Sequence, residues 1–545
     1  MRKHKYKFIL RESDNFRDQN RKRRQKDWLS ELQILTLSDY FVAKDQKHIM
    51  TYAFITAAEA AATIHHGDTV GIGGFSSVGT PKAVPEALAA YAEAQHAQGK
   101  EFKVGLITGG ATGSQVDSAL VKAHAVSFRT PFQSNKDMRT AINQHEVQYF
   151  DLHLSQIGQD VRYGFLGKIH VAIVEASDLT DDGEIILSTS VGISPTLLQQ
   201  AERVIIELNE AHTGKLTGMH DIYILDNPPY RTEIPLYHVN DRTGRTSVKI
   251  DPKKITGVVR TNARDHIAAF TPQNEATLQI GHNVASFLLR EWKNGAIPKE
   301  FLPLQSGVGN IANAVLGALG DDPNLPAFSM FTEVIQNSVI DLMLKDRIRF
   351  ATGSSLTLSE DHLDTMYDHI GTFRDRILLR PQEITNHPEM IRRLGIIAIN
   401  TALEADIFGN VNSTHVSGSQ IMNGIGGSGD FARNAFLSIF TTPSVAKGGL
   451  ISSIVPQVSH VDSTEHDVRI LVTEQGVADL RGKSPSQRAR CIIENCAHPD
   501  YKQLLWDYLK LSEGHSCHTP MSLRHAFQMH LAYAETGDMR NTKFD

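Results

Sequence analysis

The sequence predicts an α/β protein with two open-sheet domains that face each other across a cleft. Short apolar runs alternate with helical stretches from Thr56 onward, and glycine turns follow several of these runs. This alternation is typical of βαβ units and predicts mainly parallel sheets covered by helices. A turn-rich segment, residues 225–267, separates two such series, and 545 residues are too many for one core. We therefore place a domain boundary near Arg264, between residues 50–263 and 264–545.

The first series begins with Thr56 and Glu59, which predict a capping box at a helix start. Residues 68–75 predict a buried strand that ends in a glycine turn, and residues 83–95 resume a helical pattern. Further strands are predicted in the run that starts at Lys103 and in the runs that end at Glu175 and Glu207.

The second series opens with a predicted helix over residues 274–294, followed by a strand and glycine loop over residues 301–312. An apolar run, residues 327–335, contains Glu333 and precedes a helix-like stretch, residues 336–343. The remaining predicted elements are strands at 396–400, in the stretch that ends at 452–456 and at 468–473, and helices at 388–394 and 484–495.

Composition excludes several classes of protein. The chain has 41% hydrophobic and 21% charged residues, which is ordinary for a globular enzyme. Its net charge of −6 gives no general reason to expect nucleic-acid binding, and no apolar run approaches the roughly 20 residues of a membrane span. Three cysteines, Cys491, Cys496 and Cys517, are too few for a disulfide framework, so we expect a reducing cytoplasm.

The first 49 residues differ from the rest in composition. They are rich in lysine and arginine with interleaved acidic residues, and they lack the apolar core of a secretory signal. We expect residues 1–49 to form a solvated, disordered extension. Met50 immediately precedes the start of regular patterning, which makes it a candidate initiator residue.

Four glutamates close apolar runs that are typical of strands: Glu175, Glu207, Glu333 and Glu474. A carboxylate in such a place must be neutralised, hydrogen-bonded or used in chemistry, because an unpaired buried charge is costly. Loops at the carboxyl ends of strands gather ligand groups, so each glutamate is either a candidate nucleophile or an ordinary loop anchor. The residues alone leave the choice among the four open.

Two glycine-rich segments are candidate anion sites. Residues 307–313 resemble a dinucleotide fingerprint without its third glycine, and the chain has no P-loop pattern, so nicotinamide and ATP sites are disfavoured. A glycine loop before a helix can still bind a phosphate, although a tight turn explains the pattern equally well. Residues 423–434 include four glycines within six positions. That density favours backbone amides aimed at an oxyanion over a flexible surface loop.

A zinc site is a further chemical alternative. Its candidate ligands have loose spacing and no second well-spaced pair follows them, so packing cysteines and solvent histidines are the better interpretation, and we predict no bound metal. The candidates are Cys491, Cys496, His498, His515, Cys517 and His518.

Six motifs, in order between about Phe54 and about Leu505, carry a family likeness. With them the chain resembles the acetyl-CoA hydrolase/transferase family, and within it most closely the succinyl-CoA:acetate CoA-transferases. The first 49 residues fall outside the likeness. The motifs are Thr-Pro-Lys-Ala-Val-Pro from Thr80, Pro-Phe-Gln-Ser-Asn-Lys from Pro131, Gln-Ser-Gly-Val-Gly-Asn-Ile-Ala-Asn-Ala-Val from Gln305, Thr-Glu-Val-Ile-Gln from Thr332, Gly-Gly-Ser-Gly-Asp-Phe-Ala-Arg-Asn-Ala from Gly426, and Thr-Glu-Gln-Gly-Val-Ala-Asp-Leu-Arg-Gly from Thr473.

The resemblance implies two CoA-transferase-type (NagB/RpiA-like) α/β domains, an active site in the cleft between them, and a homodimer. It implies that Glu333 is the nucleophile and that Gly427 belongs to the oxyanion hole. Glu474 is a weaker candidate for positioning the active-site carboxylate, and Lys82 is a weak candidate for attracting anions. The residues implied near CoA are Val308, Gly309, Asn310, Ile311, Ala312, Asn386, Asn423, Gly427 and Lys447.

The implied reaction moves CoA from succinyl-CoA to acetate or to a similar short carboxylate such as propionate. Glu333 would carry CoA as a glutamyl-CoA thioester, so ping-pong kinetics are expected. Acyl-CoA and short carboxylates are the expected partners, coenzyme A is a substrate, and no permanently bound cofactor is expected. The alternatives are acetyl-CoA hydrolysis, propionyl-CoA:succinate transfer, and a catalytically silent CoA sensor whose basic tail touches nucleic acid. The retained Glu333 argues against the sensor.

Overall fold

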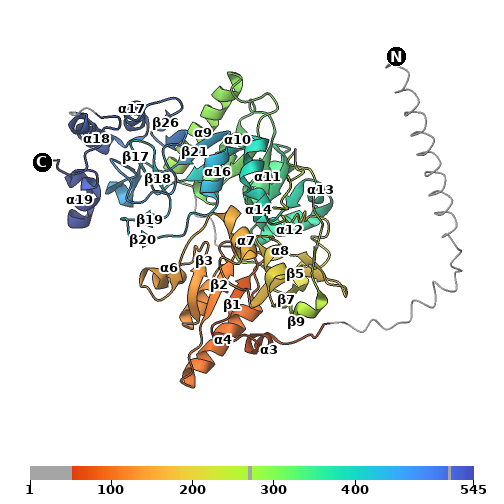
Figure 1. The fold of residues 1–545 in the computed structure, drawn as a ribbon. Helices are drawn as coiled ribbons and strands as arrows, with labels where there is room; N and C mark the ends of the chain where they lie inside the picture. Colours follow the sequence, from red (N-terminus) through yellow and green to blue (C-terminus); the bar gives the residue numbers. More distant parts are fainter. Residues whose placement is uncertain (1–51, 268–272, 514–516, 545) are drawn as a thin grey trace, which may run out of the picture. The chain divides into compact units, whose positions relative to one another are not determined.

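Two large β-sheets organise the chain, one on each side of the predicted boundary near Arg264 (Figure 1). The computed structural model describes residues 52–267, 273–513 and 517–544, and we call the parts before and after residue 264 the first half and the second half. The expected extension, residues 1–49, and the candidate initiator Met50 lie outside the described residues.

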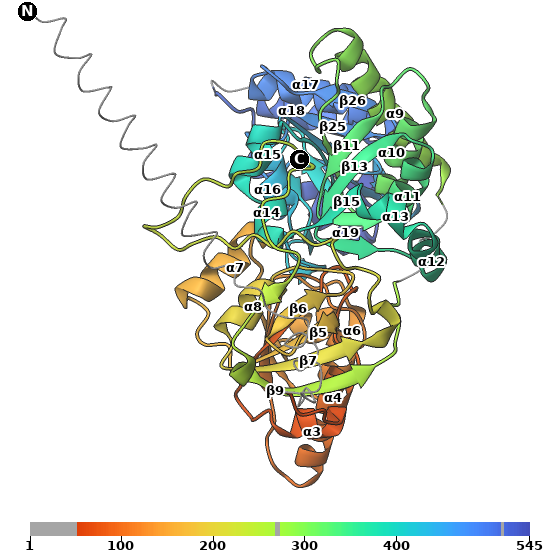
Figure 2. The same cartoon turned by 90° about the vertical axis from the view of Figure 1, so that its right-hand side faces the viewer.

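The first half contains a nine-stranded sheet. Its strands run in the order β4-β3-β2-β1-β5, and β7 and β9 continue the parallel arrangement beyond β5, where Figure 2 shows β5, β7 and β9 side by side. β6 pairs antiparallel with β5, and β8 pairs antiparallel with β6. The bounds are β1 Thr69–Ile72, β2 Val104–Thr108, β3 Val126–Thr130, β4 Gln148–Tyr149, β5 Val171–Leu179, β6 Glu184–Leu187, β7 Arg203–Asn209, β8 Val248–Lys249 and β9 Ile255–Thr261.

The second half contains an eight-stranded sheet in the order β15-β13-β11-β10-β16-β21-β25-β26. All neighbours in it are parallel except β25 and β26. The bounds are β10 Leu304–Ser306, β11 Phe328–Phe331, β13 Ile348–Gly353, β15 Ile377–Leu379, β16 Ile397–Thr401, β21 Leu437–Thr441, β25 Ile470–Thr473 and β26 Gly476–Asp479.

Small sheets accompany the large sheet of the second half. One joins β12 to β14, one joins β17 to β18 and β24, and two are antiparallel pairs, β19 with β20 and β22 with β23. The bounds are β12 Val334–Gln336, β14 Ser355–Thr357, β17 Glu404–Asp406, β18 Val411–Asn412, β19 His415–Val416, β20 Gln420–Ile421, β22 Val445–Ala446, β23 Ile451–Ser452 and β24 Ile454–Val455.

Helices lie between many of the parallel strands, and α17, α18 and α19 follow the last strand, β26. In the first half they are α3 Ala57–Ala62, α4 Ala83–Ala97, α5 Asp117–Lys122, α6 Lys136–Asn143, α7 Leu154–Tyr163 and α8 Ser194–Gln200. In the second half they are α9 Glu275–Lys293, α10 Asn310–Asp321, α11 Asn337–Leu344, α12 Glu360–Asp368, α13 Ile370–Arg374, α14 Gln382–Thr385, α15 Pro388–Leu394, α16 Ser428–Asn434, α17 Pro485–Cys496, α18 Pro499–Ser512 and α19 Gln528–Thr536.

The predicted α/β class with mainly parallel sheets is confirmed, and its local signals explain several element ends. The Thr56 hydroxyl accepts a hydrogen bond from the backbone N–H of Glu59, and the Glu59 carboxylate accepts one from the N–H of Thr56, which forms the predicted capping box of α3. Asn274 caps α9 in a similar way. The helices predicted at 388–394 and 484–495 correspond to α15 and α17.

One prediction about strands is wrong. The turn-rich segment 225–267 is not only a connection, because it contains β8 and the seven-residue β9, which extends the first sheet beside β7. The sequence prediction missed β9 because turn-forming residues flank its apolar residues, which include the buried Val258 and Val259. The strand predicted in the stretch that ends at 452–456 is present as the two-residue strands β23 and β24, which belong to small sheets.

The two halves share one hydrophobic core. It includes Leu197 and Met219 from the first half together with Leu356 and Leu379 from the second. The chain from Tyr52 onward forms one compact unit. The domain division at 263/264 therefore stays a prediction, while the halves have separate sheets. Among residues 52–267, 273–513 and 517–544, no helix combines the length and apolar character needed to cross a membrane.

Candidate active site

Three of the four strand-end glutamates are held by partners. The Glu207 carboxylate accepts hydrogen bonds from the first backbone N–H groups of α4, including that of Val84 at 3.0 Å, and so caps the helix. Glu175 forms an ion pair with Lys82, whose Nζ lies 2.5 Å from Oε2. Glu474 accepts hydrogen bonds from the backbone N–H and the hydroxyl of Ser444. These contacts are typical of anchoring carboxylates.

Glu333 lies at a cavity of about 310 Å³ between the two halves. The chain changes sheets at this residue, since β11 ends at Phe331 in the large sheet and β12 begins at Val334 against β14. The backbone C=O of Glu333 accepts hydrogen bonds from the N–H groups of Ser354 and Ser355. The first half lines the cavity with Phe75, Ser76, Ser77, Gly110, Ala111, Phe132, Ser134 and Leu154, and the second with Val308, Glu333, Val334, Asn400, Thr401, Ser413 and residues 423–428.

The electrostatic environment of Glu333 favours its protonated form. Among the described residues that line the cavity, it has the only ionisable side chain. Burial raises the pKa of the half-buried Glu333 carboxyl to about 7, the nearby Asp430 carboxylate adds to this, and a 2.6 Å hydrogen bond from Nδ2 of Asn386 opposes it. A carboxylate with a raised pKa is more basic, which suits a nucleophile or a general base.

Gly427 lies directly against this carboxylate. It is the N-cap residue of α16, and a Cβ at this position would overlap Oε1 of Glu333 and Nδ2 of Asn386. Its φ of −93° is ordinary, so space and not backbone conformation requires glycine here. The neighbouring Gly426, by contrast, has a φ of +59°, in the left-handed region that favours glycine. The segment thus approaches Glu333 more closely than any side chain would allow.

The predicted glycine loop before α10 also reaches the cavity. Val308 lines it and is 49% exposed, and Gly309 follows as the N-cap residue with a φ of +119°. The C=O of Gly307 accepts a hydrogen bond from Nε2 of Gln336 at 3.3 Å, which ties the loop to the segment after Glu333. Asn310, Ile311 and Ala312 form the first turn of α10.

Comparison with known protein families explains this arrangement. Residues 41–260 match the acetyl-CoA hydrolase/transferase N-terminal domain, and residues 363–509 match the C-terminal domain of the same family. The chain belongs to the acetyl-CoA hydrolase/transferase family. The family resemblance predicted from the sequence is therefore confirmed.

Several relatives with named activities are similar in sequence to this chain over most of its length. A propanoyl-CoA:succinate CoA transferase of Escherichia coli is 50% identical over 485 residues, covering 89% of this chain and 98% of the relative. A succinyl-CoA:acetate CoA-transferase of Clostridium kluyveri is 48% identical over 487 residues, covering 89% and 90%. An acetyl-CoA hydrolase of Schizosaccharomyces pombe is 44% identical over 491 residues, covering 87% and 94%. The predicted transferase activity and its hydrolase alternative both occur among these relatives.

Solved structures support the fold. RipA from Yersinia pestis superposes with a TM-score of 0.65 at 22% identity and covers 85% of this chain and 98% of its own. A 4-hydroxybutyrate CoA-transferase from Porphyromonas gingivalis superposes with a TM-score of 0.57 at 22% identity and covers 84% and 97%. The predicted CoA-transferase-type fold is confirmed by these likenesses.

The structure brings most of the predicted family site residues together. Asn386, at the end of α14, is buried and contacts Glu333, and Asn423 lines the cavity. Lys447 is exposed instead, and its Nζ donates to the hydroxyl of Tyr533 at 2.8 Å. Lys447 is not among the described residues that line the cavity, so its role near CoA stays a prediction.

Sequence reasoning missed two kinds of residue at the site. One is an apolar wall formed by the clustered side chains of Phe75, Phe132, Leu154 and Val334. The other is Asp430, a buried carboxylate within 3.3 Å of Nδ2 of Asn386. The available signal for Asp430 was an acidic residue three positions after Gly427, in the first turn of a helix.

Lys82 and the metal alternatives lie apart from the cavity lining. Within the described part of the chain, the one grouping of side chains suited to a metal ion is Glu175, His212 and Asp265. The Lys82 ammonium already pairs with both carboxylates, at 2.5 and 2.9 Å. Of the cysteine and histidine candidates for zinc, Cys496 is buried in α17, and His515 lies outside the described residues.

Proposed function

We propose that the protein is a CoA-transferase that moves CoA from succinyl-CoA to acetate or a similar short carboxylate, with Glu333 as the nucleophile. The observation that carries this proposal is a basic carboxylate at a cavity, in contact with an amide donor and an approaching glycine segment. The transferases of Escherichia coli and Clostridium kluyveri, at 50% and 48% identity, support the choice of reaction and of succinyl-CoA.

The proposed chemistry begins with attack of a Glu333 carboxylate oxygen on the acyl-CoA carbonyl. The thioester C–S bond breaks, giving an acyl-glutamyl anhydride and the CoA thiolate. The thiolate then attacks the glutamyl carbonyl, which releases the first carboxylate and leaves a glutamyl-CoA thioester. An acceptor carboxylate repeats both steps in reverse, so a new acyl-CoA leaves and Glu333 is regenerated.

Groups around Glu333 would stabilise the charge that develops in these steps. Each tetrahedral intermediate carries an oxyanion, and preorganised N–H donors at such a position contribute about 3 to 4 kcal/mol each. The Nδ2 donor of Asn386 and the backbone of Gly427 are the groups that the fold brings against the carboxylate. We propose the Val308 loop, at the N-terminus of α10, as the CoA contact.

The apolar wall supports transfer over hydrolysis. Phe75, Phe132, Leu154 and Val334 present hydrocarbon to the space beside Glu333, where a short acyl chain fits better than water. Hydrolysis is the second candidate, because the acetyl-CoA hydrolase of Schizosaccharomyces pombe is 44% identical. The two reactions would differ in whether water or a carboxylate reaches the glutamyl-CoA thioester.

The test is acetyl-CoA formation from succinyl-CoA and acetate, beside a reaction without acetate. We expect acetate-dependent product with the wild type and a loss of at least about a thousandfold with Glu333→Ala. Glu202→Gln is the matched control, because this glutamate is exposed and its side chain pairs with the exposed Lys168. Equal release of free CoA without acetate would establish hydrolysis, and full activity of Glu333→Ala would overturn the assignment of the nucleophile.

A second readout tests the intermediate itself. With acyl-CoA and no acceptor, the wild type should gain a mass equal to CoA less water, located on the peptide that contains Glu333. Glu333→Ala should gain none. A wild-type enzyme that turns over without forming this adduct would require another mechanism.

We also propose a homodimer in a reducing cytoplasm. The dimer rests on the family resemblance, and the compartment on the three cysteines, which are free thiols in the structure. Sedimentation equilibrium should give twice the 60.3 kDa chain mass, and a monomer at all concentrations would contradict the dimer.

A further inference from the structure

One segment of the first half, from Tyr149 at the end of β4 to Arg162 in α7, contacts the loops of the second half that surround Glu333. We call it the bridging segment. Its most direct contact is with Asp430, whose carboxylate accepts hydrogen bonds from the backbone N–H of Ser155 at 3.0 Å and from its hydroxyl at 2.6 Å. Residues 275 positions apart are thus joined next to the cavity.

Asp430 in turn contacts the amide that touches Glu333. Nδ2 of Asn386 donates to Oε1 of Glu333 at 2.6 Å and to Oδ2 of Asp430 at 3.3 Å. Oδ1 of the same amide accepts from the hydroxyl of Thr385 at 2.9 Å. The NH2 group of an amide has two hydrogens, both in the amide plane. With a carboxylate acceptor for each hydrogen and a hydroxyl donor for the oxygen, the Asn386 amide has a single favourable orientation. In that orientation one N–H points at Glu333.

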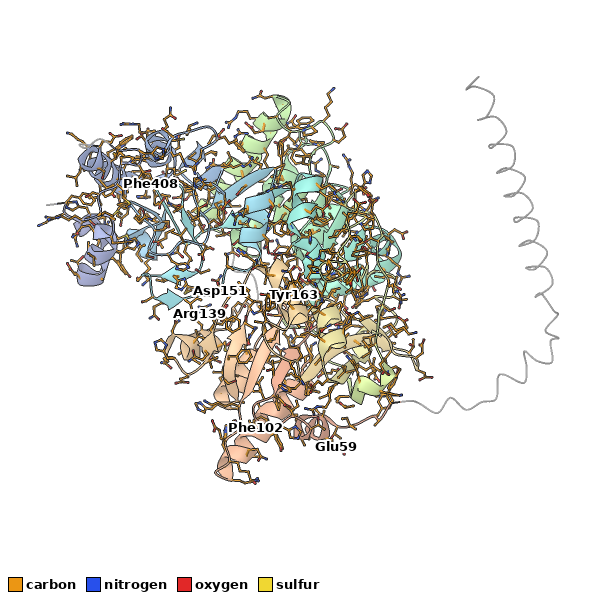
Figure 3. The ribbon with its side chains drawn as sticks, in the orientation of Figure 1. Glu59, Phe102, Arg139, Asp151, Tyr163 and Phe408 are labelled. Atoms are coloured by element: carbon orange, nitrogen blue, oxygen red, sulfur yellow. The ribbon has the colours of Figure 1, made fainter. Side chains whose placement is uncertain are left out.

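The same segment fixes the glycine-rich loop on the other side of Glu333. The Asp151 carboxylate accepts from the N–H of Ile425 at 2.8 Å, and the Tyr149 hydroxyl donates to the C=O of Asn423 at 2.6 Å. Figure 3 shows Asp151 where the first half meets the second. These bonds hold the backbone just before Gly427, whose position against Glu333 tolerates no side chain.

The far end of the bridging segment holds α14, the helix that ends at Asn386. The Arg162 guanidinium makes two bonds to the Glu383 carboxylate, at 2.5 and 2.7 Å. Nε2 of Gln382 donates to the C=O of Leu154 at 2.9 Å. Paired guanidinium–carboxylate bonds of this kind have strict geometry. The bridging segment therefore contacts both structures that border the Glu333 carboxylate, α14 with its Asn386 donor and the glycine-rich loop with Gly427.

We propose that Ser155 and Asp430 are positioning residues for the reaction: through them the first half holds the Asn386 amide in the orientation that donates to Glu333. This inference rests on the proposed role of Glu333 as the nucleophile. It predicts that removing either group loosens the amide and slows attack by Glu333, while leaving the binding of acyl-CoA nearly unchanged.

The charge of Asp430 adds a second, separable effect. The titratable groups that face it are His153, whose Nδ1 lies 3.9 Å from Oδ1, and Glu333 across the Asn386 amide. A negative charge at Asp430 makes ionisation of Glu333 less favourable. Replacing Asp430 with Asn removes that charge, so the acid limb of the rate profile should move toward lower pH.

The experiment compares Ser155→Ala, Ser155→Thr and Asp430→Asn with wild type, using the full-length chain. We expect kcat to fall about tenfold for Ser155→Ala and about a hundredfold for Asp430→Asn, with KM for succinyl-CoA changed by less than about twofold. Ser155→Thr keeps a hydroxyl and should retain most activity. Ser522→Ala is the matched control, because Ser522 is also half-buried and hydrogen-bonded but lies near the C-terminal end.

Two readouts separate positioning from a loss of folding. Formation of the glutamyl-CoA adduct in a single turnover should slow with kcat, and the acid limb should move to lower pH in Asp430→Asn but not in Ser155→Ala. Adduct formation at the wild-type rate in both variants would overturn this inference. Failure of the wild type to form the adduct would instead overturn the proposed function. If Asp430→Asn fails to fold, Ser155→Ala, which removes only one hydroxyl, still tests the inference.

Discussion

Glu175 lies in a parallel strand and Glu333 lies just after one, yet the charged groups around the two glutamates differ. Glu175 in β5 is fully buried and bonds the Lys82 ammonium, at 2.5 Å, and the Ser188 hydroxyl, at 2.7 Å. Glu333 opens on a cavity and bonds a neutral amide, with a second carboxylate behind that amide. The first carboxylate is engaged in an ion pair with a cation, whereas the second faces a cavity and a neutral amide.

The difference shows what makes a strand-end carboxylate available for chemistry. Burial alone would lower the pKa of Lys82, but the Glu175 and Asp265 carboxylates raise it above its ordinary value, so the ammonium stays charged. At Glu333, burial and a like charge act in the same direction and raise the pKa of the carboxyl. The two sites are distinguished by access to the cavity and by the charge of the neighbouring groups more than by burial.

The largest effect is expected from removing the cation of the structural pair. Lys82→Met leaves the Glu175 and Asp265 carboxylates buried without their partner, which should destabilise the fold by about 3 to 5 kcal/mol. The urea midpoint should fall strongly, while activity per folded molecule at low temperature stays close to wild type. Lys168→Met is the control, because that lysine is exposed and its pair with Glu202 is worth at most about 1 kcal/mol.

Equal midpoints for the two lysine variants would show that the buried cluster is not a structural ion pair. A loss of activity in folded Lys82→Met would instead link the cluster to catalysis and remove the contrast with Glu333.

At the other site, the close contact between Gly427 and Glu333 can be tested by adding a side chain at position 427. Gly427→Ala places a methyl group where the Glu333 carboxylate and the Asn386 amide now lie, so both must move. We expect kcat to fall by about a hundredfold to a thousandfold, as for the loss of an oxyanion-hole donor. Gly371→Ala is the matched control, because a Cβ there meets no atom within 4 Å. Full activity of Gly427→Ala would mean that this segment does not act on the carboxylate.

The sequence predicted the α/β class, several helix starts and a short set of candidate residues, because those signals are local. The capping box at Thr56 and the helix end at Asn294 each depend on residues a few positions apart. Val308, Glu333, Asn423 and Gly427, chosen from motifs, do line one cavity.

Long-range pairing accounts for what could not be predicted. Glu175 pairs with a lysine 93 positions away, and Asp430, beside Asn386, is hydrogen-bonded to a serine 275 positions away. No local pattern encodes such partners. The strand β9 was missed for a related reason, since its place beside β7 depends on tertiary packing and not on its turn-rich flanks.

The pH dependence of the rate tests the raised pKa of the Glu333 carboxyl. As the proposed nucleophile, Glu333 must be ionised to attack, and its carboxyl has a pKa raised to about 7, so the ionised fraction falls as pH falls through that value. We expect kcat/KM for succinyl-CoA to decrease about tenfold per pH unit below about pH 7, or about a hundredfold by about pH 5. A rate that stays constant down to an ordinary glutamate pKa would show that burial does not raise the basicity of Glu333.

The smallest effect is expected at Lys447, the exposed counterpart of the buried Lys82. Its ammonium lies 5.3 Å from the Tyr533 ring centroid and is accessible to solvent, so it can attract an anionic CoA only through screened interactions. Lys447→Met should raise KM for succinyl-CoA by about two- to fivefold at low salt, corresponding to about 0.5 to 1 kcal/mol, with kcat unchanged. The difference should disappear in about 1 M salt, where the Debye length is about 3 Å. An unchanged KM at low salt would separate Lys447 from the CoA site, whereas a large effect that persists at high salt would place its ammonium in a desolvated contact with CoA, which an exposed lysine does not make.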